Sequence, residues 1–207
     1  MSKYPEFTQK KDVIFEGTSL THDEQTHIRG KPLQYLLYTI RMFKEFTDAK
    51  VIVEVGSIRQ AMHHSITDFN PVCCNDGHST YFWKNYTCAE VYTVDIDPQC
   101  KNIINNDTRL AGVNIYTQDA NTYLSGFHKP IDLLFLDAWD VNEGTPYAEE
   151  HLKAYLICKD KLAARCLILI DDTDVGNKGK GRLLIPKLIE DGFVCLTEGR
   201  QTLFIRN

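Results

Sequence analysis

Residues 51–57 read Val-Ile-Val-Glu-Val-Gly-Ser, and this stretch decides the expected fold. Its β-branched residues surround one carboxylate, Glu54, and the run stops at Gly56. The pattern predicts a buried parallel strand that ends in a tight turn. In open α/β sheets the ligand crevice lies beyond the carboxyl ends of the strands, and a glycine there lets the backbone approach a ligand closely. We therefore expect Glu54, Gly56 and Ser57 beside a ligand, although an ordinary core strand leaving through a glycine turn would look similar.

Strand and helix patterns alternate along the rest of the chain. Further strands are predicted at 91–95, 113–117, 131–136 and 166–170, with a closing antiparallel pair at 193–196 and 201–205; helices are predicted at 32–47, from 97–98 to about 110, at 147–162 and near Pro186. This alternation predicts an α/β fold with a Rossmann-like, doubly wound, mostly parallel seven-stranded sheet and a C-terminal antiparallel strand.

Carboxylates follow strand after strand, and parallel strands bring them to one edge of the sheet. The acids at these positions are Glu54, Asp95, Asp119, Asp137, Asp171 and Asp172. One such acid is commonly a helix cap, but several in register would repel one another unless a cation or a hydrogen-bonding ligand lay among them. The repetition therefore indicates a functional site.

Composition and charge narrow the classes of partner. The 207 residues carry a formal net charge of -5, which disfavours nucleic-acid binding. The sequence has no apolar run long enough for a membrane span and no signal-peptide core, and its seven scattered cysteines favour reduced thiols in a cytoplasmic protein.

We expect one domain, with residues 1–47 as an N-terminal lead or lid and helix and residues 48–207 as a nucleoside-binding core. A small molecule or glycan is the expected substrate, and the oligomeric state, a homodimer included, stays open.

Two metal- or phosphate-binding patterns are incomplete. The insert between residues 59 and 75 carries His63, His64, Cys73 and Cys74, but adjacent pairs lack the gap that lets two side chains hold one zinc ion. A structured surface loop is the preferred interpretation. The nicotinamide fingerprint G-x-G-x-x-G and the phosphate loop are both absent, which favours a cationic nucleoside over a pyrophosphate ligand.

The residues resemble the class I S-adenosylmethionine-dependent methyltransferases over roughly 51–205. Glu54-Val-Gly56 is similar to the first motif of that family, Asp95 to the acid that holds the ribose, and Asp119 with Ala120 to the segment near the adenine. The resemblance is closest to the metal-dependent O-methyltransferases typified by catechol O-methyltransferase. Gly77-His78-Ser79 matches the Gly-x-Ser of that branch, which implies that Ser79 binds the methionine carboxylate.

The same resemblance implies a metal site. Asp137, Asp171 and Asp172 match the residues that hold Mg²⁺ in that branch, and Leu136-Asp-Ala-Trp139 is close to its Leu-Asp-His-Trp. Oxygen ligands of this kind suit a hard cation that binds and acidifies a substrate hydroxyl, although Mn²⁺ or Ca²⁺ would serve as well as Mg²⁺.

One departure concerns the general base. Catechol-methylating members have a lysine three residues after the first metal Asp, where this chain has Asp140. We expect Asp137 and Asp140 at the catalytic end, with Asp140 as base, metal ligand or substrate contact. Loss of the lysine favours a sugar or polyol over a catechol.

Several alternatives stay open at this level. One alternative concerns a basic loop, which either contacts an anionic group of the substrate or is a solvated surface loop; its residues are Lys178, Lys180 and Arg182. Another concerns Trp139, which either lines the site or belongs to the core. The leading hypothesis is an S-adenosylmethionine- and Mg²⁺-dependent O-methyltransferase acting on a polyol, sugar or catechol-like hydroxyl. A metal-independent methyltransferase on another nucleophile, or a non-catalytic nucleoside-binding module, are the alternatives.

Overall fold

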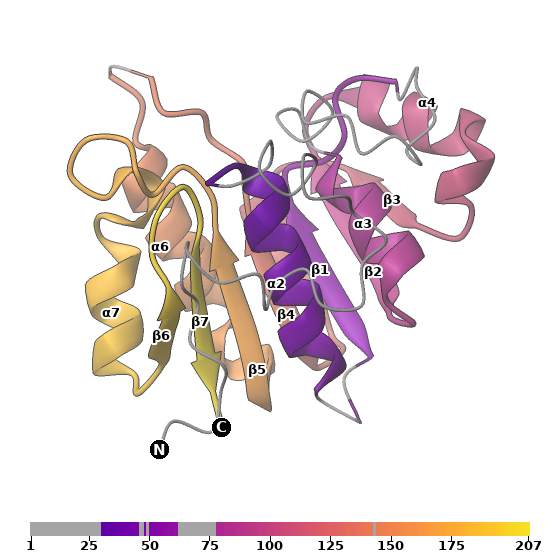
Figure 1. Ribbon diagram of the computed structural model, residues 1–207. Coiled ribbons are helices and arrows are strands. Elements are labelled where there is room, and N and C mark those ends of the chain that lie inside the picture. Colours follow the sequence, from indigo (N-terminus) through magenta and orange to yellow (C-terminus); the bar gives the residue numbers. More distant parts are fainter. Residues whose placement is uncertain (1–29, 46–47, 49, 62–77, 143) are drawn as a thin grey trace.

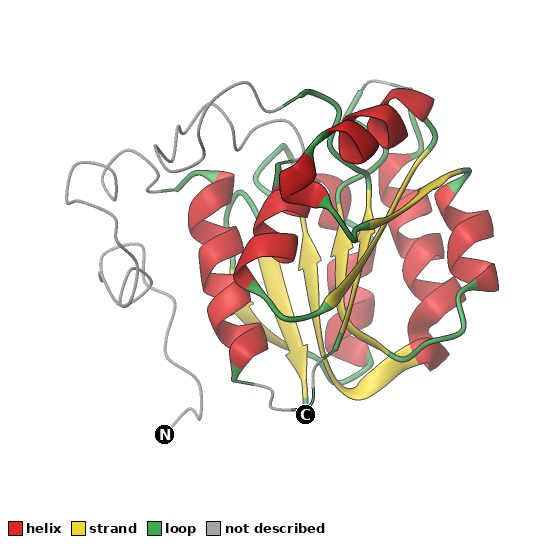
Figure 2. Ribbon diagram, turned by 90° about the vertical axis from the view of Figure 1, so that its right-hand side faces the viewer, coloured by secondary structure: helices red, strands yellow, loops and turns green. Residues whose placement is uncertain are grey.

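A computed structural model describes residues 30–45, 48, 50–61, 78–142 and 144–207. One seven-stranded sheet lies between two layers of helices, with α2 in front of the strands in Figure 1 and the sheet seen between the layers in Figure 2. The predicted lead at 1–29 and the insert with His63, His64, Cys73 and Cys74 lie outside the described residues.

The elements follow one another in the predicted alternation. They are α2 (Pro32–Lys44), β1 (Val51–Val55), α3 (Ser79–Tyr86), β2 (Glu90–Asp95), α4 (Pro98–Asn106), η4 (Thr108–Leu110), β3 (Asn114–Thr117), α5 (Ala120–Gly126), β4 (Ile131–Leu136), α6 (Tyr147–Cys158), η5 (Lys159–Lys161), β5 (Leu162–Ile170), η6 (Gly179–Gly181), α7 (Leu184–Glu190), β6 (Val194–Thr197) and β7 (Thr202–Arg206).

The sheet has the strand order β3-β2-β1-β4-β5-β7-β6. The first five strands in this order pair in parallel, and β7 runs antiparallel to both β5 and β6. The predicted Rossmann-like, mostly parallel sheet is therefore confirmed. None of the helices in the described ranges is both long and apolar enough to cross a membrane.

Alternation along the strands divides the apolar side chains between two cores. Ile52 of β1 packs on the side of α2 and α3, with Trp83 and Phe135 among its neighbours. Val53 and Val55 point to the opposite side, where α5, α6 and α7 pack. Because both faces are covered, the central parallel strands are mostly apolar, as in residues 131–136, where Asp132 is the one charged residue.

Some boundaries differ from the prediction for local reasons. The helix expected to reach Leu110 ends at Asn106, because Asp107 caps a separate 3-10 turn by accepting a hydrogen bond from the Arg109 amide. Helix α5 was not predicted; with seven residues it is too short to show a helical period. Strand β5 begins at Leu162 instead of residue 166, which shortens the helix before it.

Candidate active site

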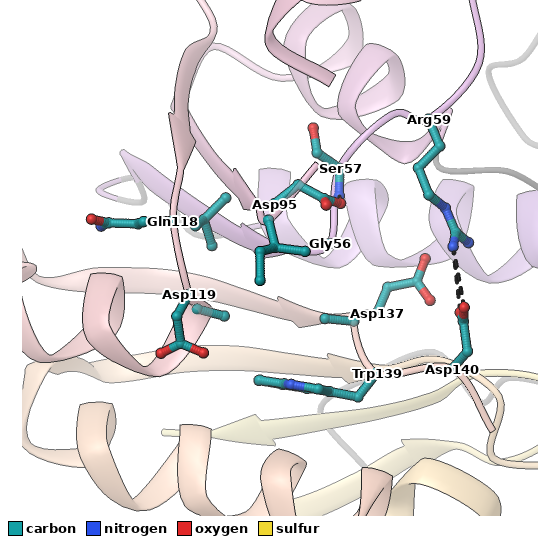
Figure 3. Close-up of a pocket in the computed structure, with 13 residues that line it drawn as sticks. Gly56, Ser57, Arg59, Asp95, Gln118, Asp119, Asp137, Trp139 and Asp140 are labelled. Atoms are coloured by element: carbon teal, nitrogen blue, oxygen red, sulfur yellow. Dashed lines mark hydrogen bonds and ion pairs between the residues drawn. The ribbon is translucent and has the colours of Figure 1, made fainter. Parts of the chain in front are cut away.

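A cavity of about 290 Å³ opens at the carboxyl ends of β1, β2, β3 and β4 (Figure 3). It is lined by Gly56, Ser57, Arg59, Val94, Asp95, Ile96, Gln118, Asp119, Ala120, Asp137, Ala138, Trp139 and Asp140. This is the place where open α/β sheets bind their ligands, between strands whose connections leave in opposite directions. We call this cavity the strand-end pocket.

Gly56 allows β1 and β4 to come together beneath the pocket. Its φ is +92°, and a Cβ there would lie 2.8 Å from the carbonyl carbon and oxygen of Asp137. The Asp137 amide donates a hydrogen bond of 2.7 Å to the Val55 carbonyl, which carries the pairing of β1 and β4 one residue beyond the strands. No side chain fits at residue 56 without displacing the backbone that carries Asp137.

Asp95 is held rigidly at the end of β2. Its Oδ2 accepts a hydrogen bond of 2.9 Å from the Ser57 amide, and its Oδ1 accepts one of 2.9 Å from the Asp97 amide. Each carboxylate oxygen keeps a further lone pair for a ligand. A fixed, half-buried carboxylate of this kind suits the two hydroxyls of a ribose.

Ser57 and Ile96 add one polar and one apolar surface to the pocket. The Ser57 Oγ is buried and has no hydrogen-bond partner among the described residues. A buried hydroxyl without a partner is costly, and a ligand in the pocket would supply the missing bond. Ile96 is 77% exposed and offers an apolar face for a flat ring.

Asp119 and Ala120 begin helix α5 at the far end of the pocket from Asp140 (Figure 3). Asp119 caps the helix, with its Oδ1 accepting bonds of 2.8 and 2.9 Å from the amide and hydroxyl of Thr122. Asp119 is thus a helix cap, the common role of a single acid that follows a strand, and it also lines the pocket.

Glu54 lies inside the molecule and does not line the pocket. Its carboxylate accepts hydrogen bonds from Ser79 Oγ (2.6 Å), Thr80 Oγ1 (2.5 Å) and Trp83 Nε1 (3.1 Å). Burial raises the pKa of Glu54 to about 7, even though the hydrogen bonds from these donors act to lower it. The expectation that Glu54 joins the other acids at the sheet edge is wrong, because its side chain shares the face of Ile52 and meets α3.

The segment predicted to hold a carboxylate sits behind this network. His78 and Ser79 are buried at the start of α3, and the Ser79 hydroxyl is engaged by Glu54. Neither residue lines the strand-end pocket, and Gly77 lies outside the described residues. Their predicted role in binding the cofactor stays a prediction.

Three carboxylates do converge beyond β4 and β5. Asp137, Asp171 and Asp172 offer ligand atoms that all lie within 4.8 Å of one another. The Asp171 amide continues the β4–β5 pairing by donating to the Leu136 carbonyl at 3.1 Å. Burial, followed by the charge of Asp137, raises the pKa of Asp171 well above its usual range. We call these residues the three-Asp cluster.

Two cations of the chain already contact the three-Asp cluster. The Lys180 Nζ lies 2.9 Å from Asp137 Oδ1 and 3.0 Å from Asp172 Oδ2, and the Arg200 guanidinium pairs with Asp172. Burial alone would lower the pKa of Lys180, but Asp137, Asp171 and Asp172 raise it above its usual value. The expectation that Lys180 lies on a solvated loop or meets the substrate is wrong; its side chain is 1% exposed. Lys178 and Arg182 pair at the surface with Glu198 and Glu149.

The cluster with Lys180 in place does not fit a divalent cation. Three carboxylate oxygens are suitable ligands for Mg²⁺, which binds at about 2.1 Å. An ion at that distance from Asp137 Oδ1 would lie within about 5 Å (2.1 + 2.9) of the Lys180 nitrogen, and the two positive charges would repel. The chain supplies its own cation where the resemblance implies a metal.

Arg59, Trp139 and Asp140 form the other end of the pocket. Arg59 Nη1 lies 3.4 Å from Asp140 Oδ1, and Figure 3 shows the two side chains facing each other across the pocket mouth. Trp139 has φ +53°, a left-handed conformation that is unusual for a bulky residue and often marks a functional site. Its indole ring meets the His151 ring edge-to-face at 5.1 Å and also lines the pocket.

Sequence reasoning missed Arg59, Ile96 and Gln118 as lining residues. Each is within two positions of a residue that was predicted, namely Ser57, Asp95 or Asp119. Extending every strand end by four residues would have found them, because the loop after a strand continues along the crevice.

Comparison with known proteins agrees with this geometry. Residues 73–173 match a family model described as a methyltransferase domain. No curated protein matches the chain.

Solved structures share the fold at low sequence identity. The methyltransferase PaMTH1 of Podospora anserina, bound to S-adenosylhomocysteine (SAH), is 16% identical with a TM-score of 0.59 over 93% of this chain and 91% of its own. An O-methyltransferase of Bacillus cereus in complex with SAH is 13% identical, with a TM-score of 0.55 over 93% and 95% of the two chains. MycE, of the mycinamycin biosynthetic pathway, in complex with Mg and SAH, is 15% identical, with a TM-score of 0.56 over 81% of this chain and 48% of its own.

Proposed function

We propose that the chain is a class I methyltransferase, on the basis of its fold and of the methyltransferase domain that residues 73–173 match, and that it uses S-adenosylmethionine to methylate a hydroxyl group of a polyol or sugar. The observation that carries this proposal is the strand-end pocket. It joins a fixed acceptor, Asp95, to an unsatisfied buried hydroxyl, Ser57 Oγ. A nucleoside bound in the pocket would give the Ser57 hydroxyl its missing hydrogen-bond partner and would use the free lone pairs of Asp95.

The pocket residues divide the work of binding between them. Asp95 accepts the ribose hydroxyls, Ile96 and Ala120 contact the adenine, and Asp119 lies near its amino group. Gly56 and Ser57 lie where the backbone can approach the cofactor closely. S-adenosylmethionine supplies an activated methyl group on a sulfonium, so positioning of the acceptor accounts for much of the remaining rate enhancement.

Asp140 is the proposed base at the acceptor end. Its carboxylate is 57% exposed and lies at the pocket mouth, where it can take the proton of an acceptor hydroxyl. Asp137 also lines the pocket, but its Oδ1 is engaged by Lys180, so we assign it to binding the acceptor. The carboxylates of Asp137 and Asp140 favour a hydroxyl-rich acceptor over an apolar one.

The experiment is methyl transfer from S-adenosylmethionine labelled in its methyl group to a panel of polyols, sugars and catechols, with SAH titrated calorimetrically in parallel. We expect transfer to one acceptor class, and loss of transfer with retained SAH binding in Asp140→Asn. If SAH binds but no acceptor is methylated, the chain is a nucleoside-binding module; if SAH does not bind, the proposal fails.

The magnesium-dependent form of the same reaction is a second candidate. It is favoured by one observation, the three carboxylate ligand atoms within 4.8 Å. It would require Lys180 to leave the three-Asp cluster. Transfer that stops on exhaustive chelation and returns with Mg²⁺ would favour this form, and transfer that survives chelation would exclude it.

A further inference from the structure

Lys180 is the most deeply buried cation of the site. Its side chain is 1% exposed, and its Nζ donates to Asp137 Oδ1 at 2.9 Å and to the Asp137 carbonyl at 3.2 Å, and lies 3.0 Å from Asp172 Oδ2. A buried lysine is stable only when its charge is paired and its protons are accepted. All three contacts come from residues at the ends of β4 and β5, so Lys180 bridges the two strands that carry the three-Asp cluster.

Arg200 is the second cation that contacts the three-Asp cluster. It pairs with Asp172 and lies 3.7 Å from both Asp171 Oδ2 and Asp174 Oδ1. Counted with all groups ionised, the three carboxylates of the cluster and these two cations sum to -1 (-3 + 2). Arg200 is also shared with Asp174, so what opposes a divalent cation here is the position of the two positive charges against the cluster and not the net sum.

Two glycines determine the backbone path of the loop that places Lys180 against the three-Asp cluster. At Gly179, φ is +44° and a Cβ would overlap the Asp172 carbonyl oxygen. At Gly181, a Cβ would lie 2.5 Å from Ile185 Cδ1 and 3.1 Å from Thr173 Cγ2. The 3-10 turn Gly179–Gly181 therefore packs directly on the segment after β5, and the residue between the two glycines is fixed by the backbone.

We propose that Lys180 is a fixed internal counter-ion that takes the place of a divalent cation in the three-Asp cluster. Lys180 is a positioning residue: it holds Asp137 and Asp172 together and orients the Asp137 carboxylate at the edge of the strand-end pocket. If the proposed methyl transfer is correct, it follows that the reaction needs no bound metal. The metal-binding part of the inference does not depend on that reaction.

The test measures metal binding by the whole chain, with Mn²⁺ as the probe and electron paramagnetic resonance of the free ion as the readout. Three variants are compared with wild type: Lys180→Met removes the charge and keeps a long apolar side chain; Lys180→Arg keeps a charge; Lys178→Met removes a neighbouring surface lysine. SAH binding, measured on each variant, reports whether the nucleoside pocket is intact.

We expect no stoichiometric Mn²⁺ site in wild type, in Lys180→Arg or in Lys178→Met. In Lys180→Met a stoichiometric site should form and bind Mn²⁺ at least about tenfold more tightly than any residual binding by wild type, because a like charge about 5 Å away has been removed. The Tm of Lys180→Met should rise with added Mg²⁺ while that of wild type does not, since a ligand that binds only the folded state stabilises it.

Two results would overturn the proposal. One is a stoichiometric Mn²⁺ site in wild type that Asp172→Asn abolishes. The other is a Lys180→Met variant that binds SAH normally but gains no Mn²⁺ site. A Lys180→Met variant that folds only when purified with Mg²⁺ would support the proposal, because the metal then supplies the missing charge. Failure of SAH binding in wild type would instead count against the proposed function.

Discussion

The hydroxyl of Ser79 donates a hydrogen bond of 2.6 Å to Glu54, and this contact fastens the start of α3 to the middle of the sheet. Thr80 and Trp83 add two further donors to the same carboxylate. A buried acid thus organises the helix that covers β1, and it does so from the face opposite to the one that α5 and α6 cover.

Glu54 should make the stability of the fold depend on pH. Burial raises its pKa from 4.5 to about 7, so the folded chain holds this proton where the unfolded chain releases it. Its contribution is fully present below pH 4.5 and is lost as the pH rises through 7; a shift of about 2.5 units corresponds to about 3 kcal/mol. The measurement is chemical denaturation of wild type and of Glu54→Gln at pH values from 4.5 to 8. The free energy of unfolding of wild type, minus that of Glu54→Gln, should fall by this amount over that range. Equal pH profiles for the two proteins would disprove it.

Gly56→Ala should damage both the fold and the pocket. The positive φ costs about 1–3 kcal/mol for a residue with a side chain, and the new Cβ would press on the Asp137 carbonyl. We expect a lower free energy of unfolding and loss of SAH binding in calorimetry. Gly126→Ala is the matched control, since its Cβ would meet nothing within 4 Å and it lies in helix α5. That variant should be as stable as wild type or more so.

The mostly parallel sheet and the positions of its strands along the chain could be predicted from the sequence, because strand periodicity and strand-end acids are local patterns. The direction of one side chain was the first failure: Glu54 was assigned to the crevice, although its even spacing from Ile52 places both on the face toward α3. Asp95 and Asp137 occupy the edge of the sheet as expected, because Asp95 is the last residue of β2 and Asp137 directly follows the last residue of β4.

Lys180 was the second failure, and it had a different cause. A Gly-rich loop with two lysines has the composition of a solvated turn. Its packing against Asp172 depends on a contact between Gly179 and a carbonyl oxygen, which no spacing in the sequence reveals. Composition therefore predicted the surface position of Lys178 and not the burial of Lys180.

Asp95→Ala should weaken SAH binding about 10- to 100-fold, since a hydrogen bond to a charged group is worth about 1.5–3 kcal/mol. The neighbouring acid provides the control. Asp97 caps α4 by accepting from the Gln99 amide at 2.9 Å and does not line the pocket. Asp97→Ala should cost about 1 kcal/mol of stability as a lost cap, with SAH affinity unchanged. Equal losses of SAH affinity in Asp95→Ala and Asp97→Ala would show that Asp95 acts only by holding the loop after β2 in place and does not bind the nucleoside.

Ser57→Ala should separate stability from binding. Its buried hydroxyl lacks a partner in the described structure, so its removal should leave the free energy of unfolding unchanged or raise it. SAH affinity should fall about three- to tenfold, the value of a neutral hydrogen bond. Ser125→Ala is the control: its Oγ already donates to the Asn121 carbonyl at 2.8 Å, so stability should fall slightly and affinity should not change. Unchanged SAH affinity in Ser57→Ala would show that this hydroxyl does not contact the ligand.

Arg59 should recognise the amino-acid end of the cofactor. Its guanidinium lines the pocket, and Asp140, at 3.4 Å, is its partner across the mouth. A carboxylate would bind such a fork in two parallel hydrogen bonds. Arg59→Met should therefore weaken binding of SAH and leave binding of 5′-methylthioadenosine, which lacks the amino-acid group, unchanged. Asp140→Asn removes the competing acid and should bind SAH at least as tightly as wild type. If Arg59→Met weakens both ligands equally, Arg59 shapes the pocket without reading the carboxylate, and the start of α3 with Ser79 becomes the place to look for that contact.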